Sequence, residues 1–463
     1  MRTLLKNGTV VNDSDCVKAD VLIEDGIIKE VSSSIDAPDA ELTDAGGKLL
    51  LPGAVDAHTH MDLDVGFTRA CDDFYSGTVA AACGGTTTII DHMAFGPKGV
   101  YPWHQVKEYH SLADGNAVTD YSFHGVLQEK ADDRTLAEIR EIAEKEGITS
   151  FKLYLTYDMM LHDKDVFAVL NEAKRSNILI TVHCENDGIV NYLRDRCGAE
   201  NNLTAAFHPK SRPAEAEAEA VNRMLYMAEC ADEAPLYIVH LSSEAGLKEV
   251  LAARKRGQKH FGVETCPQYL VLNDSLYDDP EEGLKAIMSP PLRKDSDRTA
   301  LWEALKNDFL DTVATDHCPF TFENQKQRGK DDFRLCPNGA PGVEERLPLL
   351  FSEGYGKGRI TLPQCVKYLC VNPAKIFGLY PKKGVIKPGS DADIVIMDPE
   401  KTRTIRSASL HGNADYSCYE GMEIKGAIDM VFLRGEMIVK DNEFLGKKGT
   451  GRYLKRGISS LCL

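Results

Sequence analysis

The chain has 463 residues, enough for one large and one small domain, and a (β/α)-barrel of about 250 to over 400 residues could account for most of it. Its 54 lysines and arginines against 71 aspartates and glutamates give a net charge of −17, which disfavours nucleic acid and anionic membranes as partners. No apolar run approaches the roughly 18 residues of a membrane span, and the opening MRTLLKNGTVVNDSD turns polar too early for a signal peptide, so we expect a cytoplasmic enzyme with a small, weakly charged substrate.

Residues 1–50 are typical of short strands, and residues 381–445 repeat this pattern at the far end of the chain. Four dipeptides are turn signals for these strands: Asn7-Gly8, Asp25-Gly26, Pro388-Gly389 and Arg434-Gly435. Neither end has enough strands to bury a core by itself. We therefore expect both ends to form one small sheet domain.

Residues 51–380 alternate apolar runs with helical stretches. The eight runs are GAVDAHTH, TTTIIDH, YSFHGVL, ITSFKLYL, ILITVHCE, PLYIVHLS, HFGVETCP and DTVATDHCP. This alternation predicts a parallel barrel rather than an antiparallel sandwich. The locally basic tail, residues 446–463, is expected to be a solvated or subunit-contacting arm.

The chain has 13 cysteines without CxxC spacing. Several of them, such as Cys83, Cys184 and Cys266, lie inside apolar runs. This distribution predicts reduced, buried thiols rather than a disulfide framework or a zinc ribbon.

Polar residues end several of the predicted strands. His58 and His60 follow the first run at i and i+2, so both side chains point to the same side, although an HxH pair alone is weak evidence. His183, His240 and Asp316 end the fifth, sixth and eighth runs. Each alone could be a core histidine or a helix N-cap aspartate. Because the ends of barrel strands meet on one face, the five together predict a metal site.

Lys152 lies in SFKLYLTY, a run that otherwise predicts a buried strand. Two divalent cations near four neutral imidazoles would repel each other unless an anion bridged them. A carbamate formed from the lysine amine and carbon dioxide would supply that bridge and remove a costly buried cation. The alternative is an ordinary lysine paired with an acid such as Asp158.

Ten motifs run in order through almost the whole chain: GAVDAHTHMDLDVG, GGTTTIIDH, SFKLYLTY, VHCEN, IVHLS, ETCPQYL, SPPLR, ATDHCPF, PNGAPGVE and KPGSDADIVI. By these motifs the chain resembles the cyclic amidohydrolases. Within the family it is similar to the hydantoinase and dihydropyrimidinase branch, above all to bacterial D-hydantoinases of the phenylhydantoinase type. The resemblance implies an α/β fold, a (β/α)8 TIM barrel with a small β-sandwich formed from both termini, and a homotetramer.

The resemblance also implies two divalent metal ions per subunit, zinc first and manganese, cobalt or nickel as alternatives. One metal would be bound by His58, His60 and Asp316, the other by His183 and His240, with N6-carboxylysine at Lys152 as the bridge. Tyr157 matches the tyrosine beside the oxyanion, and Ser289 and Asn338 match residues whose backbone holds the cyclic amide or ureide edge. Leu63, Val65 and Tyr154 match the loops around the ring substituent.

The resemblance therefore implies an enzyme that opens the ring of 5-substituted hydantoins to give N-carbamoyl amino acids. It implies preference for the D-isomer and tolerance of aryl substituents. The nucleophile would be a hydroxide bridging the two metals, and Asp316 would transfer its proton. Asp62 stands where dihydroorotases carry a substrate-binding arginine, which disfavours an acidic ring. Arg69, in the same loop, could bind a more polar substituent of the substrate, although a solvent-exposed arginine without such a role is the simpler interpretation. A dihydropyrimidinase or an allantoinase with the same chemistry stays open, as does a catalytically silent scaffold.

Overall fold

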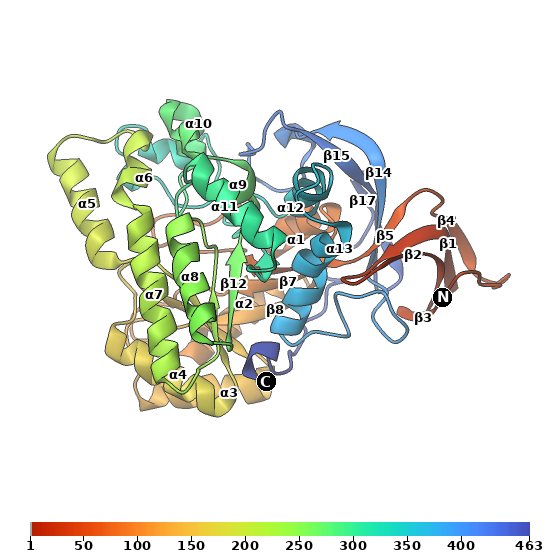
Figure 1. Ribbon diagram of the computed structural model, residues 1–463, viewed down its shortest axis with the longest axis horizontal. Coiled ribbons are helices and arrows are strands. Elements are labelled where there is room, and N and C mark those ends of the chain that lie inside the picture. Colours follow the sequence, from red (N-terminus) through yellow and green to blue (C-terminus); the bar gives the residue numbers. More distant parts are fainter. Residues whose placement is uncertain (1) are drawn as a thin grey trace.

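The computed structural model describes residues 2–463 as a barrel with a sheet beside it (Figure 1). Eight parallel strands form the barrel in chain order. They are β6 (Ala54–Thr59), β7 (Thr86–His92), β8 (Asp120–Val126), β9 (Ser150–Tyr154), β10 (Leu179–His183), β11 (Leu236–Ile238), β12 (Phe261–Thr265) and β13 (Thr312–Val313). A parallel bridge from Thr59 to His317 joins the last strand region to the first. All eight strands predicted from the sequence are therefore present.

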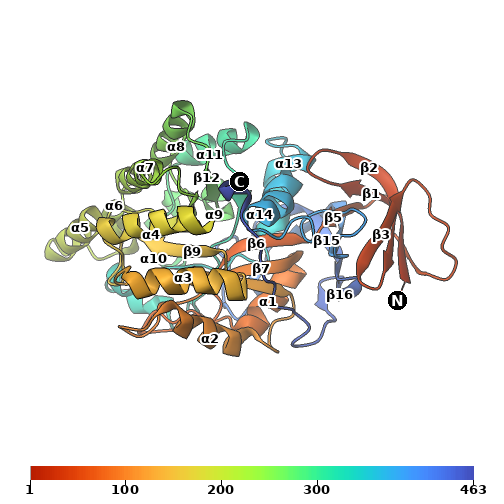
Figure 2. The ribbon, with the colours of Figure 1, turned by 90° about the horizontal axis from the view of Figure 1, so that it is seen from below.

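Helices cover the outside of the barrel, and α2, α3 and α4 follow one another along it in Figure 2. The longer helices are α1 (Phe74–Cys83), α2 (Pro102–Ala113), α3 (Asp133–Glu146), α4 (Asp163–Ser176), α5 (Asp187–Ala199), α7 (Ala214–Cys230), α8 (Glu244–Arg256) and α11 (Asp295–Lys306). The shorter ones are α6 (His208–Ser211), α9 (Pro267–Val271), α10 (Pro280–Lys285), α12 (Arg346–Leu349), α13 (Leu362–Val366) and α14 (Asn372–Ile376). None of the helices in residues 2–463 is both long and apolar enough to cross a membrane.

Local sequence signals explain where the helices start and stop. Asp132 caps α3 by accepting a hydrogen bond from the backbone of Thr135, and Ser243 caps α8 in the same way. At the other ends, Gly147 after α3 and Gly257 after α8 adopt positive φ angles of 66° and 97°. Glycine reaches this conformation without strain, so both helices end there.

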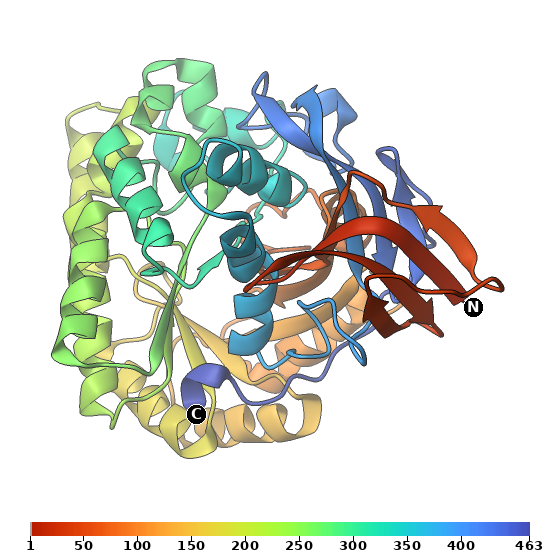
Figure 3. The same ribbon diagram turned by 45° about the vertical axis from the view of Figure 1, so that its right-hand side comes forward.

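The second sheet is built from both ends of the chain, as the sequence predicts. Its strands are β1 (Arg2–Val11), β2 (Cys16–Glu24), β3 (Ile27–Ser32), β4 (Glu41–Asp44), β5 (Leu49–Pro52), β14 (Ile394–Thr404), β15 (Glu423–Leu433), β16 (Glu436–Lys440) and β17 (Glu443–Phe444). The two halves join where β14 pairs antiparallel with β5. In Figure 3 this sheet stands beside the barrel.

Three of the four turn predictions are confirmed and one is wrong. Asp25-Gly26 and Arg434-Gly435 have positive φ angles and connect β2 to β3 and β15 to β16. Asn7-Gly8 instead lies inside β1, where the register with β2 shifts, so the positive φ of Asn7 serves a bulge. Pro388-Gly389 forms a turn in the loop before β14, where the N–H of Ser390 donates to the carbonyl of Lys387 at 3.1 Å.

The C-terminal tail packs along the end of the barrel where the strands begin. Tyr453 forms a parallel bridge with Tyr121, and Leu454 donates a backbone hydrogen bond to Tyr121. The buried side chain of Arg456 donates to Ser122 and to the carbonyl of Phe123. The tail is therefore anchored to the barrel at Tyr453, Leu454 and Arg456, whereas its other basic residues are exposed as its composition predicts: Lys447, Lys448, Arg452 and Lys455. A contact with another subunit stays a prediction.

A buried lysine connects the barrel to the sheet. Lys383 Nζ lies 2.6 Å from Asp120 at the start of β8, 2.9 Å from Asp391 and 2.7 Å from Asp393. All four side chains are buried. Arg434, directly after β15, also pairs with Asp120, so two cations and three carboxylates connect the barrel to the sheet at the end opposite the histidines.

All 13 cysteines are free, and Cys83, Cys184 and Cys266 are buried, as their sequence context predicts.

Candidate functional site

Two of the predicted histidines meet at the aspartate that follows β13. His58 lies near the end of β6 and His60 directly after it. The Nε2 atoms of both rings lie 3.1 Å from Oδ1 of Asp316. The strand ends thus bring together residues that are more than 250 positions apart in the sequence.

The other two histidines form a second pair beside the first. His183 is the last residue of β10 and His240 lies just after β11. Their Nδ1 and Nε2 atoms are 2.9 Å apart, and the ring of His240 is 5.5 Å from that of His58. All four imidazoles are buried. They form one cluster, which we call the histidine cluster.

Lys152 lies within β9 and is 1% exposed. Its Nζ atom lies 5.4 Å from the ring of Tyr154, which is 5.8 Å from the ring of His183, and its charge acts on all four imidazoles of the histidine cluster. Burial lowers the pKa of Lys152 to about 8 against the opposing influence of Asp316 and Glu264. In the described residues 2–463, no ion pair joins Lys152 to an acid, and Asp158 is exposed. The ordinary paired lysine is therefore not what the fold provides.

Buried acids orient the histidines, and the sequence analysis missed them. Glu264, at the end of β12, lies 2.6 Å from Nδ1 of His58 and accepts the backbone N–H of His240. Glu185 lies 2.8 Å from Nε2 of His183 and pairs with the buried Arg212. A carboxylate on one ring nitrogen fixes the tautomer and turns the other nitrogen toward the cluster. Glu264 lies in the ETCP motif and Glu185 in the HCEN motif, but neither motif predicts which side chain its glutamate contacts.

Three predicted site residues have backbone conformations that are unusual for side-chain-bearing residues. The φ angles are 80° at Tyr157, 40° at His240 and 54° at Asp316. Such conformations cost on the order of 1 to 3 kcal/mol and persist where the surrounding structure imposes them. Their concentration here indicates that the fold places these side chains at the expense of local stability.

A third imidazole that the sequence analysis did not select lies against the first pair. His92 ends β7, and nitrogens of His58, His60 and His92 lie within 4.8 Å of one another. The ring of His92 stacks on His124 at 4.2 Å, and neither of its nitrogens has a hydrogen-bond partner in the described chain. His92 extends the histidine cluster toward the barrel axis.

The histidine cluster fits divalent metals by its own chemistry. Buried nitrogens without a hydrogen-bond partner in residues 2–463 include Nδ1 of His60, Nδ1 of His240 and both ring nitrogens of His92. An unsatisfied buried polar atom costs about 1 to 3 kcal/mol, so several in one place call for a missing partner. Neutral imidazoles with a carboxylate are ligands that zinc, manganese, cobalt and nickel accept.

Tyr157 borders the histidine cluster on one side. Its ring is 5.4 Å from that of His183, and the guanidinium of Arg212 lies 5.5 Å from the tyrosine ring. Burial raises the pKa of Tyr157, although Arg212 acts in the opposite direction. The hydroxyl is therefore protonated at neutral pH and can donate a hydrogen bond.

Ser289 and Asn338 both carry buried polar atoms. The Oδ1 atom of Asn338 makes no hydrogen bond within residues 2–463, and the hydroxyl of Ser289 interacts with Tyr157. The segments that hold them touch, because Gly339 donates its N–H to the carbonyl of Ile287. These atoms could bind the polar edge of a ligand.

The predicted substituent residues differ in exposure. Tyr154 is partly buried, with its ring 4.9 Å from that of Phe95, and Leu63 is partly buried against the core. Val65 is exposed at the tip of its loop. Arg69 is half exposed and lies 3.5 Å from Asp64 in the same loop, which fits the solvated arginine.

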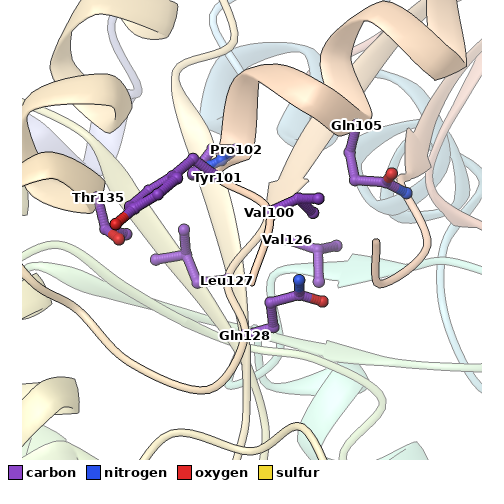
Figure 4. A pocket seen from close by; sticks show the side chains of 8 residues that line it. All are labelled: Val100, Tyr101, Pro102, Gln105, Val126, Leu127, Gln128 and Thr135. Atoms are coloured by element: carbon purple, nitrogen blue, oxygen red, sulfur yellow. The ribbon is translucent and has the colours of Figure 1, made fainter. Parts of the chain in front are cut away.

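A small hollow elsewhere on the barrel carries no comparable chemistry. Figure 4 shows it beside the start of α2, lined by residues that include Tyr101, Gln105, Leu127, Gln128 and Thr135. Its lining contains no carboxylate, imidazole or amine. This hollow therefore lacks the metal-ligating side chains that the histidine cluster brings together.

Known proteins resemble this chain along almost its whole length. A D-phenylhydantoinase of Escherichia coli O9:H4 (strain HS) is 49% identical over 458 residues, which cover 98% of each chain. The crystal structure of a dihydropyrimidinase from Brevibacillus agri is 43% identical, covers 99% of this chain and 100% of its own, and has a TM-score of 0.97. A D-hydantoinase from Bacillus sp. AR9 is 42% identical, covers 98% and 99%, and has a TM-score of 0.96. The model of the amidohydrolase family matches residues 49–438, and the chain therefore belongs to that family.

Proposed function

We propose that this protein hydrolyses the cyclic amide bond of 5-substituted hydantoins, preferring the D-isomer and accepting aryl substituents, to give N-carbamoyl amino acids. The observation that carries the proposal is the meeting of the four histidines, Asp316 and Lys152 in one buried cluster. The kinship with D-phenylhydantoinase and D-hydantoinase supports the choice of substrate.

His58, His60 and Asp316 would hold one divalent metal, His183 and His240 a second, and a carbamate on Lys152 would join them. Zinc is the first choice, with manganese, cobalt or nickel as alternatives. When bound, such metals polarise a carbonyl and lower the pKa of water. The lowered pKa of Lys152 supports the carbamate, because only the neutral amine reacts with carbon dioxide.

The chain itself would contribute proton transfer and positioning. The carboxylate of Asp316 takes the proton of the attacking water and passes it to the ring nitrogen that leaves. The hydroxyl of Tyr157 donates to the carbonyl oxygen as negative charge develops there. Backbone groups of Ser289 and Asn338 hold the amide edge of the ring, which keeps its carbonyl facing the histidine cluster.

Leu63, Val65 and Tyr154 would surround the substituent at ring position 5. Tyr154 and the neighbouring Phe95 offer aromatic surface to an aryl group. Arg69 is engaged by acids of its own loop, so it does not favour a charged substituent.

A dihydropyrimidinase is the second candidate, and the structural likeness to such an enzyme favours it. Allantoinase activity would use the same groups. A catalytically silent scaffold is disfavoured because every residue proposed to bind metal is in place.

The first experiment is ring opening by the purified, metal-analysed protein on D- and L-phenylhydantoin, dihydrouracil, allantoin and dihydroorotate in parallel. We expect about two metals per chain and preference for the D-aryl hydantoin. Another preferred ring would change the substrate and keep the chemistry. Absence of both bound metal and turnover would refute the proposed enzymatic activity and favour the catalytically silent scaffold.

The bridging role of Lys152 has its own test. Lys152→Ala should lose metals and activity together, and short carboxylic acids added with metal should restore part of both. A fully active alanine variant would refute the bridge. Carbon-13 NMR after incubation with labelled bicarbonate would detect the carbamate directly.

A cytoplasmic location and a homotetramer complete the proposal. The 13 free cysteines suit a reducing compartment, and the tetramer follows family analogy. Light scattering of the purified protein tests the assembly, and cell fractionation tests the location.

A further inference from the structure

Lys326 is a second fully buried lysine close to the proposed substrate-binding segments. Its side chain is 0% exposed, and in residues 2–463 it makes no ion pair with an acid. Instead its Nζ donates hydrogen bonds to the carbonyls of Ile287 at 2.6 Å and Pro337 at 2.9 Å. Burying an amine costs free energy, and at Lys383 nearby carboxylates compensate for this cost. Lys326 has no such ion pair in the described residues, so its presence needs another explanation.

The two carbonyls belong to the two segments that would bind the substrate edge. Ile287 lies two residues before Ser289, and Pro337 directly precedes Asn338. The carbonyl of Ile287 also accepts the N–H of Gly339 at 3.0 Å. One ammonium and one backbone bond thus fasten the segments together at their closest approach.

The carbonyls on either side of Ser289 are also occupied by buried donors. His208 Nε2 lies 2.7 Å from the carbonyl of Met288, and the hydroxyl of Tyr269 donates to that of Pro290 at 2.7 Å. No described residue bonds the carbonyl of Ser289. The surrounding bonds therefore fix the segment while leaving this acceptor available.

The residue before Lys326 reaches a third part of the proposed site. Gln325 Nε2 donates to the hydroxyl of Thr68 at 2.7 Å and to the carbonyl of Arg69 at 2.6 Å. Both belong to the loop that carries Leu63 and Val65. The turn at residues 325–326 thus contacts the substituent loop and both edge-binding segments.

We propose that Lys326 is a positioning residue that sets the separation of the Ser289 and Asn338 backbone groups and so determines how tightly the cyclic amide edge is held. The inference rests on the function proposed above. One ammonium donates to two carbonyls at once, which no apolar side chain of this length does. The pKa of Lys326 is lowered by burial, and the amine retains donors in either protonation state.

The test compares Lys326→Met with Lys326→Gln, whose amide is one atom shorter and reaches less far. Tyr277→Phe is the matched control, because that hydroxyl bonds the carbonyl of Ala286 and the N–H of Leu292 in the same segment without reaching Asn338. Two quantities are measured on the metal-loaded proteins. They are KM and kcat for the preferred ring, and the hydrogen exchange of peptides that contain Gly339.

We expect the Lys326 variants to lose about tenfold to a hundredfold in kcat/KM, mainly through KM, because misplaced binding groups weaken ground-state and transition-state binding alike. Exchange at Gly339 should accelerate at least about tenfold, metal content should stay unchanged, and Tyr277→Phe should match the unmodified protein. Unchanged KM and exchange in Lys326→Gln would overturn the proposal, as would an equal KM increase in Tyr277→Phe. If Lys326→Met does not fold, the KM and hydrogen exchange of Lys326→Gln alone test the proposal. Absence of turnover in the unmodified protein would refute the proposed function, and the exchange data would still test the role of Lys326.

Discussion

Glu264 offers the sharpest test of how this fold prepares its histidines for metal. The residue is 0% exposed, and its Oε1 atom lies 2.6 Å from Nδ1 of His58 and accepts the N–H of His240 at 3.0 Å. Its Oε2 atom accepts the hydroxyl of Tyr237 at 3.2 Å. Glu264→Gln keeps the shape and removes the charge, so one carbonyl oxygen and one amide group replace two equivalent acceptors.

The expected magnitude follows from these contacts. The amide oxygen can keep accepting from His58 and from the N–H of His240, while the amide group donates to the Tyr237 hydroxyl, which can accept and donate to Thr312 instead. The bond to His58 loses its charge assistance. Loss of such an outer partner lowers metal affinity by about 10- to 100-fold, or about 1.4 to 2.8 kcal/mol at about 1.4 kcal/mol per factor of ten.

The assay is competition between the protein and a chelator of known affinity, followed by metal analysis of the separated protein. Glu217→Gln is the control, since Glu217 is equally buried but bonds Ser242 and Ser243 rather than a histidine. We expect the metal dissociation constant to rise only in Glu264→Gln. Equal metal affinity in both variants would show that the carboxylate does not tune His58.

Other residues give three further predictions. Tyr157→Phe should keep its metals while kcat falls about 10²- to 10³-fold, because one donor to the developing oxyanion is lost; unchanged turnover in steady-state assays would remove Tyr157 from the mechanism. Burial and the neighbouring Glu344 raise the pKa of Glu345 to about 7 from 4.5, so its proton stays bound in the folded state while the unfolded state loses it. Stability should therefore fall by about 2 to 3 kcal/mol as pH rises from 4.5 to 7, and denaturant unfolding of Glu345→Gln should lack this decline. Lys383→Met should lose about 3 to 5 kcal/mol, since the buried Asp391 and Asp393 lose their ion-pair partner while Asp120 keeps Arg434; an unchanged melting curve would contradict the role assigned to that lysine.

Much of the fold could be predicted from the sequence because the relevant signals are local. Strands such as β7 and β10 are short apolar runs that end in a polar residue, and this pattern marks a buried parallel strand and its active end. The turn at Asp25-Gly26 was equally local, since two residues with positive φ suffice to reverse the chain. Asn7-Gly8 carries the same signal, yet pairing with β2 across the bulge overrides it.

The C-terminal tail shows the limit of composition as a guide. Its basic residues predicted exposure, but Arg456 finds carbonyl and hydroxyl acceptors at the start of β8 and becomes buried. Such acceptors become visible only once the barrel has formed. Charge alone does not determine whether a side chain stays in water.

The sequence by itself determined the residue types of the site and their order at the strand ends, because a strand fixes which way His58 and His60 point. Only the tertiary structure decided which carboxylate orients which imidazole. Glu264 contacts His58, 206 positions away, and Glu185 contacts Arg212, 27 positions away. No local sequence pattern predicts contacts over such separations. The role of Lys326 is of the same kind, since its two acceptors lie 39 and 11 residues away and meet only when the barrel closes.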